Sequence, residues 1–306
     1  MLFNRVNKLA LAIVASAIFI YPTLAGAAGT FSLTPGKEEV SLAPGAATIK
    51  NLTVVNNLGR EASFTLNLES VAGSEVPGET VKFLTQTASP YSLQRFLTLP
   101  VKTFTLRDGE SRVVPVAIDV PATTPPGGYF GALTVAVTPE SKSVTKVTAR
   151  LSSLWFVKVD GPVAAAGHLL NFGPIGGVWQ FWPKQLNFQF SFQNEGNTYL
   201  NPYGGIELKP RLAWGFTRSI IVPPNFVLPG STRLFEIKAP AGTFCGWYKT
   251  TLKLNRGYNN VIDEQGGNLI TCGRSFSFIL LVIILILTGL TWWLVIKLKR
   301  RHLNKV

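Results

Sequence analysis

The sequence is poor in the residues that carry most catalytic and metal chemistry. Its 306 residues include two histidines, His168 and His302, and two cysteines, Cys245 and Cys272. Neither pair has the close spacing of a metal site, and no G-x-S-x-G motif or phosphate-binding loop occurs. We therefore expect a protein that is not an enzyme, with no catalytic residues and no metal or cofactor.

Long hydrophobic runs occur at the two ends of the chain. The first, LALAIVASAIFI, follows Arg5 and Lys8 and is ended by Pro22, and LAGA offers small residues for cleavage at Ala27. This is the pattern of a secretory signal peptide, predicted for residues 1–27. An uncleaved N-terminal anchor is the alternative.

The second run, residues 276–296, contains no charge and has the length of a membrane-spanning helix. Residues 297–306 are a basic tail, which the positive-inside rule places in the cytoplasm. The sequence thus predicts one C-terminal transmembrane α-helix. The location expected is the plasma membrane, single-pass, with the N-terminal ectodomain outside and the C-terminus cytoplasmic.

Charged residues make up only 15% of the chain, and their balance is basic, with a formal net charge of +13. The signal peptide holds two of these positive charges and the tail five, which leaves +6 for the region between them. This excess is small and suits a solvated surface or contact with anionic polymers and lipid headgroups. Because the chain is expected to be exported, we predict no nucleic-acid partner.

The region between the two ends reads as all-β. Short alternating runs are separated by clusters rich in Gly and Pro, and FQFSFQ places Phe188, Phe190 and Phe192 on one face. Strands of this length and spacing are typical of β-sandwiches.

One stretch of sequence occurs twice, at Gly109–Val135 and at Gly230–Leu254. Each copy has a turn, an alternating strand, a proline, and a tyrosine eight residues later, Tyr129 or Tyr248. Gly128 and Gly246 suit the tight turn into the tyrosine strand, which invites comparison with the tyrosine corner of Ig-like folds. The repeated unit is a whole domain, so we predict two tandem Ig-like β-sandwich domains, residues 28–139 and 161–273. Residues 140–160 are the last strand of the first domain or a connector.

The two cysteines fall at opposite ends of a predicted hairpin in the second domain, whose tip lies near residues 258–265. This places Cys245 and Cys272 near opposite positions, and an oxidising compartment permits a bridge. We predict a structural disulfide between them.

Several motifs resemble those of a known family. LAPGAATIKNLTVVNNLGREASFTLNL and IDVPATTPPGGYFGALTV resemble the peptidoglycan-binding domain of the WxL-interacting proteins of Gram-positive bacteria. NEGNTYLNPYG, VLPGSTRLFEI and GWYKTTLKL resemble the domain that follows it. The resemblance implies surface anchoring and attachment to the wall or to a partner. The chain departs from the family in lacking a long Lys-rich tail, and no residue set carries over as a peptidoglycan site.

Aromatic side chains gather in the second domain, at Trp179, Phe181, Trp182 and Trp214. Exposed rings of this kind can stack on sugars or anchor a protein. The alternative is a purely structural role, in which these rings pack between the two sandwiches or form a collar at the membrane surface.

These observations leave two functions. The first is a membrane-anchored cell-surface protein whose ectodomain binds cell-wall polymer or a partner surface protein, as an adhesin or scaffold. The alternative is a membrane-tethered assembly factor or chaperone for exported proteins that uses an exposed sheet edge.

Overall fold

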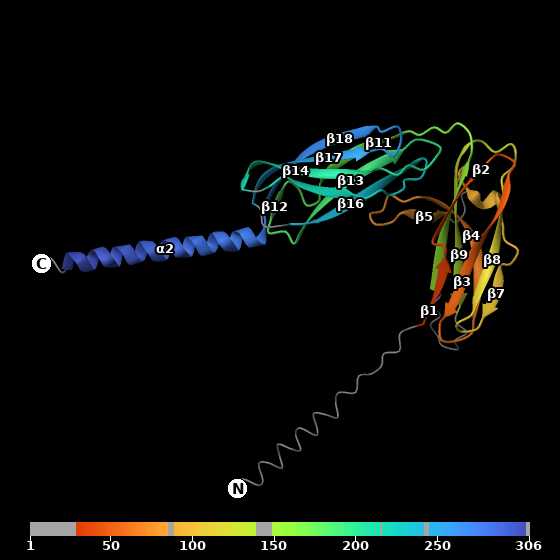
Figure 1. The fold of residues 1–306 in the computed structure, drawn as a ribbon, viewed down its shortest axis with the longest axis horizontal. Helices are drawn as coiled ribbons and strands as arrows, with labels where there is room; N and C mark the ends of the chain where they lie inside the picture. The colour runs from red at the N-terminus through yellow and green to blue at the C-terminus, as the bar shows by residue number, and fades with distance from the viewer. Residues whose placement is uncertain (1–28, 85–88, 139–148, 215, 242–244, 304–306) are drawn as a thin grey trace, which may run out of the picture.

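The computed structural model describes residues 29–84, 89–138, 149–214, 216–241 and 245–303 (Figure 1). The predicted signal peptide lies outside these ranges. The described chain is mostly β-strand and forms two β-sandwich units in tandem, set at an angle to each other, with a C-terminal helix that extends away from the second unit (Figure 1).

The first unit packs two sheets face to face. One has the order β1-β3-β8-β6, with bounds Thr30–Thr34, Ala47–Asn57, Ser111–Asp119 and Leu97–Thr98. The other has the order β2-β10-β9-β4-β5, with bounds Lys37–Leu42, Ala149–Val159, Gly127–Thr138, Ala62–Gly73 and Val81–Leu84. A further strand, β7 (Thr103–Leu106), pairs with β4, and a short 3-10 helix, η1, spans Leu93–Arg95.

The second unit repeats this plan with fewer strands. Its smaller sheet has the order β11-β13-β16, with bounds Gly167–Pro174, Gln185–Asn194 and Ser231–Pro240. Its larger sheet has the order β12-β18-β17-β14-β15, with bounds Trp179–Phe181, Ile262–Cys272, Cys245–Asn255, Tyr203–Trp214 and Arg218–Val222.

Each core is built from the alternation seen in the sequence. Phe188, Phe190 and Phe192 on β13 are fully buried, because every second side chain of a strand faces the same side of the sheet. In the first unit Trp155 is fully buried, and its Nε1 donates to Ser153 Oγ at 3.0 Å, which satisfies the one polar atom of the ring. The predicted pair of β-sandwiches is therefore confirmed.

The internal repeat is confirmed as well. β8 and β9 form the same strand–loop–strand element as β16 and β17, with Tyr129 and Tyr248 buried near the start of the second strand. The Tyr129 hydroxyl donates to the carbonyl of Pro125 at 3.0 Å, the contact of a tyrosine corner. Desolvation by burial raises the pKa of both tyrosines.

The glycines of this corner differ from the prediction at one position. Gly127 and Gly246 each have a φ of 148° and stand two residues before their tyrosines, whereas Gly128 has no such conformation. Gly127 is thus the counterpart of Gly246, because only glycine adopts that φ without strain.

A buried asparagine also recurs in both units. Asn56 Nδ2 donates to the carbonyls of Arg60 and Leu106, and its Oδ1 accepts from the backbone of Leu58. Asn194 makes the corresponding bonds in the second unit: its Nδ2 donates to the carbonyls of Thr198 and Val227, and its Oδ1 accepts from Gly196 N. Each asparagine ties its turn to a distant strand, which fixes the loop end of the sandwich.

A third apolar cluster joins the two units. It contains Phe130 and Phe156 from the first unit and Leu228 from the second, all buried, with Tyr199 and Phe226 packed against them. Asn197 adds polar contacts, since its carbonyl accepts from Gly128 N at 2.7 Å and its Nδ2 donates to the Pro126 carbonyl at 3.0 Å. The junction is therefore a packed core with paired polar groups.

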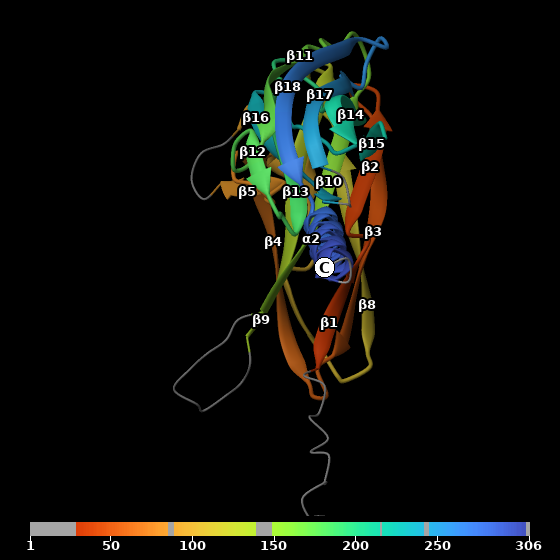
Figure 2. The same cartoon turned by 90° about the vertical axis from the view of Figure 1, so that its left-hand side faces the viewer.

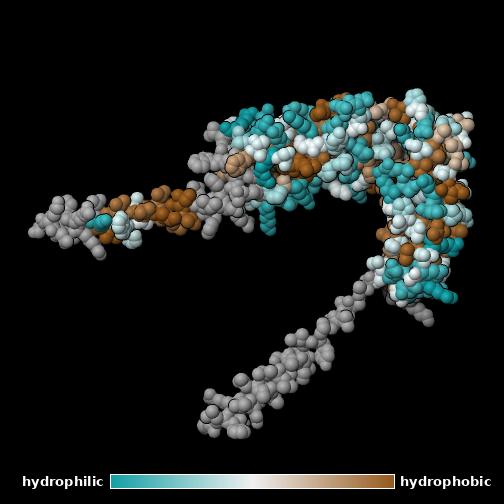
Figure 3. Space-filling model, viewed as in Figure 1, coloured by the Kyte–Doolittle hydropathy of each residue, from teal (hydrophilic) through white to brown (hydrophobic). Residues whose placement is uncertain are grey.

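The apolar run at the C-terminus forms the helix α2 (Arg274–Leu303), whose side chains are largely exposed and apolar over its described part (Figure 3). In the part of the chain that the structure describes, no helix combines the length and the apolar character needed to cross a membrane. The predicted transmembrane helix at residues 276–296 is therefore unsupported, and the predicted single-pass plasma-membrane location is wrong. The apolar run correctly predicts a helix at this position, but it is not enough to infer that the helix crosses a membrane.

Candidate functional site

The first unit leaves part of a strand unpaired. β10 pairs with β9 along its whole length, from Ala149 to Val159, but the edge strand β2 covers only Leu154–Val159 on the other side. Among the described residues no strand pairs with that side of Ala149–Ser153. We name this stretch the free edge of β10.

The hydrogen bonds of β2 show which backbone groups face outward. Leu154 N donates to the Gly36 carbonyl at 3.0 Å and Asp160 N donates to the Leu42 carbonyl at 2.9 Å, both on the β2 side. Because alternate residues of a strand direct their N–H and C=O groups to the same side, the backbone groups of Arg150 and Ser152 point to the free edge. These are the groups that a further strand would bond.

Side chains at the free edge alternate between two surroundings. Trp155, Val157 and Val159 lie on the core side of β10 and are buried, and Leu151 has the same parity. Leu151 is nevertheless 39% exposed, because no strand flanks it on the free side. An apolar side chain is thus displayed next to unpaired backbone.

The opposite face of the same stretch borders a hollow of about 480 Å³. Arg150 and Ser152 line it from β10, together with Leu68, Glu69, Phe83, Leu84, Gln94 and Thr134. The Arg150 guanidinium forms an ion pair with Glu69, and Thr134 Oγ1 lies 2.9 Å from Ser152 Oγ and donates to Glu69 Oε2 at 3.1 Å. The hollow lies on the β9 side of β10, so a strand added at the free edge would have Arg150 and Ser152 between it and the hollow.

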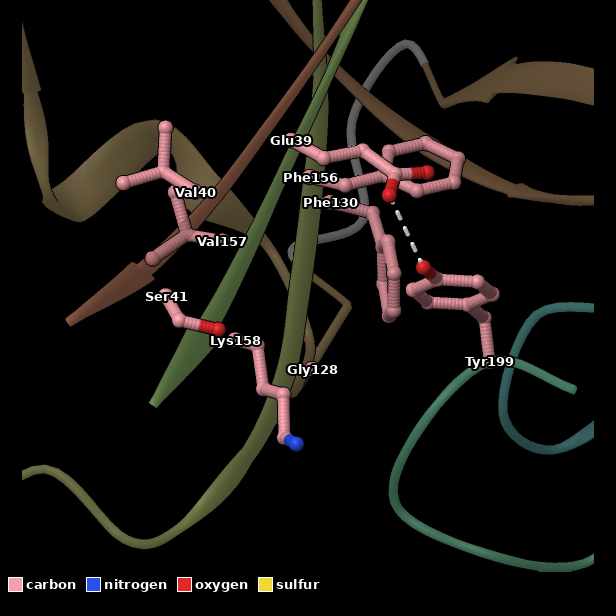
Figure 4. A pocket seen from close by; sticks show the side chains of 9 residues that line it. All are labelled: Glu39, Val40, Ser41, Gly128, Phe130, Phe156, Val157, Lys158 and Tyr199. Atoms are coloured by element: carbon pink, nitrogen blue, oxygen red, sulfur yellow. Dashed lines mark hydrogen bonds between the residues drawn. The ribbon is translucent and has the colours of Figure 1, made fainter. Parts of the chain in front are cut away.

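A second hollow, of about 240 Å³, lies at the junction of the two units (Figure 4). In Figure 4 the carboxylate of Glu39 on β2 meets the hydroxyl of Tyr199 from the second unit, which donates to Glu39 Oε2 at 3.1 Å. Desolvation by burial, with the nearby Glu39 carboxylate, raises the pKa of Tyr199 to about 12. Lys37 forms an ion pair with Glu39, and its hydrogen bond lowers the pKa of that carboxyl.

The predicted aromatic residues do not form the contact between the sandwiches. Trp179 and Phe181 lie on β12, 66% and 57% exposed, and Trp182 follows at 58%. Figure 2 shows β12 beside β18, at the end of the second unit from which α2 leaves. Trp214 lies on β14 opposite Cys245, and its side chain is outside the described residues. The structure thus gathers three of the four residues and exposes them far from the junction.

The predicted disulfide is present. Cys245 and Cys272 are bonded and lie directly opposite each other in the β17–β18 pairing. The bond lies at the end of the β17–β18 ladder, next to α2. Among the described residues no three His, Cys, Asp or Glu side chains are grouped to hold a metal ion.

Sequence reasoning missed the free edge of β10. The alternation in ARLSSLWFVKV identifies a strand, but it does not show how far a neighbouring strand reaches along it. The extent of β2 depends on the turn at residues 35–36, which transfers the chain from the β1 sheet to the β10 sheet. That pairing is parallel and non-local, and local pattern carries no signal for it.

Comparison with known proteins gives structural neighbours only. No protein-family model matches the chain, and none of the curated proteins matches its sequence. Solved structures similar to it include the class 5 fimbriae chaperone CfaA, at 11% identity over 79% of this chain and 99% of that one, with a TM-score of 0.40. The CsuC–CsuE chaperone–tip adhesion subunit complex of Acinetobacter baumannii Csu pili matches at 14% identity with the same coverages and TM-score. The E. coli chaperone DraB matches at 12% identity over 78% and 98%, with a TM-score of 0.39.

These neighbours correct the expectation drawn from the sequence. The three are a fimbriae chaperone, a complex of a chaperone with a pilus subunit, and a further chaperone, and no WxL-interacting protein is among them. The resemblance to that family is therefore withdrawn. The assignments as a peptidoglycan-binding protein or adhesin are withdrawn as well, and so are the cell-wall polymer and the membrane as predicted partners. The motifs misled because their Gly, Pro and Tyr positions serve the turn and corner of many β-sandwiches.

Proposed function

We propose that this chain is an assembly factor or chaperone that binds an extended segment of another exported protein at the free edge of β10. The observation that supports this proposal is the partial cover of β10 by β2. Strand addition to an exposed sheet edge is a common mode of peptide recognition, in which backbone bonds give affinity and side-chain pockets give specificity.

The free edge offers both kinds of contact. Arg150 and Ser152 present N–H and C=O groups that a client strand would bond. Leu151 is available to the client's apolar side chains on one face, and the side chains of Arg150 and Ser152 are available on the other. The client is therefore expected to have alternating side chains. The role is binding, with no chemical step.

The surroundings of this edge support a rigid platform for binding. On its other side β10 is paired with β9 along its whole length. The C-terminal half of β10 reaches the junction between the units, where the ring of Phe156 lies edge-on to Phe130 and Phe226. A docked strand would thus meet an edge held by both units. This limits the conformational entropy that binding has to overcome.

A substitution at Ser152 tests the proposal. The probe is a synthetic peptide of alternating valine and threonine, with lysines at its ends for solubility. Ser152→Pro removes the N–H that faces the free edge and breaks no backbone bond to β9, because edge strands tolerate proline where the N–H points outward; it also loses the hydroxyl that bonds Thr134. We expect this variant to bind the peptide at least ~10-fold more weakly, as the loss of a bond and a steric clash imply.

Ser152→Ala is the matched control, because it keeps the N–H and is expected to bind as the wild type does. Circular dichroism and thermal unfolding check that both variants are folded. If Ser152→Pro is folded and binds the peptide with unchanged affinity, the client does not bind at this edge.

A further inference from the structure

The second unit has an unpaired edge of its own, along β16. This strand pairs with β13 from Ser231 to Pro240 and is the last strand of its sheet, and no described strand covers its other side. Its beginning abuts the first unit, where Arg233 Nη2 donates to Thr80 Oγ1 at 3.1 Å. At its end, Arg218 Nη1 donates to the Pro240 carbonyl at 3.0 Å. The open stretch therefore lies between these two contacts, from Leu234 to Ala239.

Charges of opposite sign stand two residues apart in this open stretch. Glu236 and Lys238 are exposed on the outer face of β16, and neither is in an ion pair with another described residue. Ile237 between them points toward the core but is only half-buried. A half-buried apolar residue at a sheet edge gains cover when another strand is added.

We propose that β16 pairs with β16 of a second copy of this chain, antiparallel about a two-fold axis at Ile237. When two copies extend one sheet, the two-fold axis is perpendicular to the sheet. Residues at equal distances before and after the axis then lie opposite each other, with their side chains on the same face. Centring at Glu236 or at Lys238 would set that residue against its own copy. Centring at Ile237 sets Glu236 of each copy opposite Lys238 of the other.

The charge pattern thus selects one register and one orientation. Opposite charges directly across an antiparallel pair are stabilising and like charges are destabilising, and the two-fold axis makes each pair occur twice. The pairing would join the two three-stranded sheets into one and would cover Ile237 of both copies. This surface is separate from the free edge of β10 and the proposal does not depend on the function assigned to that edge.

Charge reversal followed by charge exchange tests the pairing. Sedimentation equilibrium of the full chain is expected to show a dimer. Glu236→Lys alone and Lys238→Glu alone place like charges opposite each other and are each expected to weaken dimerisation about tenfold or more. The double variant E236K/K238E restores both pairs and is expected to dimerise like the wild type. Glu264→Lys on β18 is the control for a change of net charge away from this edge.

Cross-linking tests the register. A mixture of Glu236→Cys and Lys238→Cys chains is expected to form disulfide-linked heterodimers under mild oxidation, while either variant alone stays uncross-linked. The native cysteines do not interfere because Cys245 and Cys272 are bonded to each other.

Three results would overturn the proposal. A monomer at all concentrations would mean that Glu236 and Lys238 protect the edge from pairing, a common role of edge charges. A dimer insensitive to both reversals would place the contact elsewhere, for example on the apolar side chains of α2. Failure of the double variant to recover would show that the charges do not face each other.

Discussion

Single residues show how much a position in the fold changes an ordinary side chain. Leu151 is of the same parity as the buried Trp155, yet it is partly exposed because its flanking strand ends before reaching it. Tyr199 is an ordinary phenol by sequence, and the junction gives it a carboxylate partner, Glu39. The exposure of Leu151 depends on where β2 ends, and the raised pKa of Tyr199 depends partly on Glu39. Both β2 and Glu39 are distant in sequence from the residue that they affect.

The Tyr199 contact predicts a dependence of stability on alkaline pH. The pKa of Tyr199 is raised from 10 to about 12 in the folded chain, so folding favours the protonated phenol. Its contribution is fully present below pH 10 and is lost as the pH rises toward about 12. We expect the free energy of unfolding, measured in urea, to fall across this range less steeply in Tyr199→Phe than in the wild type.

The other tyrosines with raised pKa, Tyr129 and Tyr248, are unchanged in this variant and contribute equally to both curves. Parallel curves for Tyr199→Phe and the wild type would contradict the contact between Tyr199 and Glu39.

Gly127 predicts a steric effect at the junction. Its φ of 148° is strained for any other residue, and a Cβ there would lie 2.9 Å from the Asn197 carbonyl oxygen of the second unit. We expect Gly127→Ala to lower the free energy of unfolding by about 1–3 kcal/mol. Gly173→Ala is the control, because open space surrounds that position. Equal stability of the two variants would show that the Asn197 contact does not constrain the junction.

At the scale of the elements, the disulfide fixes the end of the β17–β18 ladder. The bond between Cys245 and Cys272 closes a loop of 27 residues, and in the chain-entropy model such a closure stabilises the fold by about 3 to 4 kcal/mol. Replacing both cysteines by Ser is expected to lower the thermal midpoint of the second unit. Binding of the alternating peptide to β10 should not change, since the bond lies in the other unit. An unaltered midpoint would show that the ladder holds this end without the bond.

Local elements were predictable because their signals are local. The alternation of Phe188, Phe190 and Phe192 gave the buried face of β13, the repeated turn gave the matching pairs β8–β9 and β16–β17, and hairpin spacing gave the disulfide. The edge strands β2 and β12 are short and pair in parallel with strands far along the chain. Their extent, and therefore the free edge of β10, follows from tertiary structure alone.

One prediction failed, and one alternative is excluded, for a related reason. The apolar run at residues 276–296 was interpreted from composition, which does not show what surrounds a side chain. Composition also left open whether Trp179 and Trp182 form a binding surface or pack between the sandwiches. The aromatic rings are exposed beside β18, and the junction is formed instead by Phe130 and Phe156.

At the scale of the whole molecule, the strand that carries the free edge, β10, continues into the junction between the two units. Phe156 on β10 packs against Tyr199 and Phe226 of the second unit, and Arg233 of the second unit bonds to Thr80 of the first. A client strand at the edge would thus lie beside a junction that both units stabilise.

Amide hydrogen exchange along β10 of the full chain tests the central claim most directly. Without peptide, the amides of Arg150 and Ser152 are predicted to exchange rapidly, and that of Leu154, which is bonded to Gly36, slowly. Addition of the alternating valine–threonine peptide should slow exchange at Arg150 and Ser152, and a peptide with a central proline should not. Slow exchange of both amides in the free chain, or no slowing with the alternating peptide, would contradict strand addition at this edge.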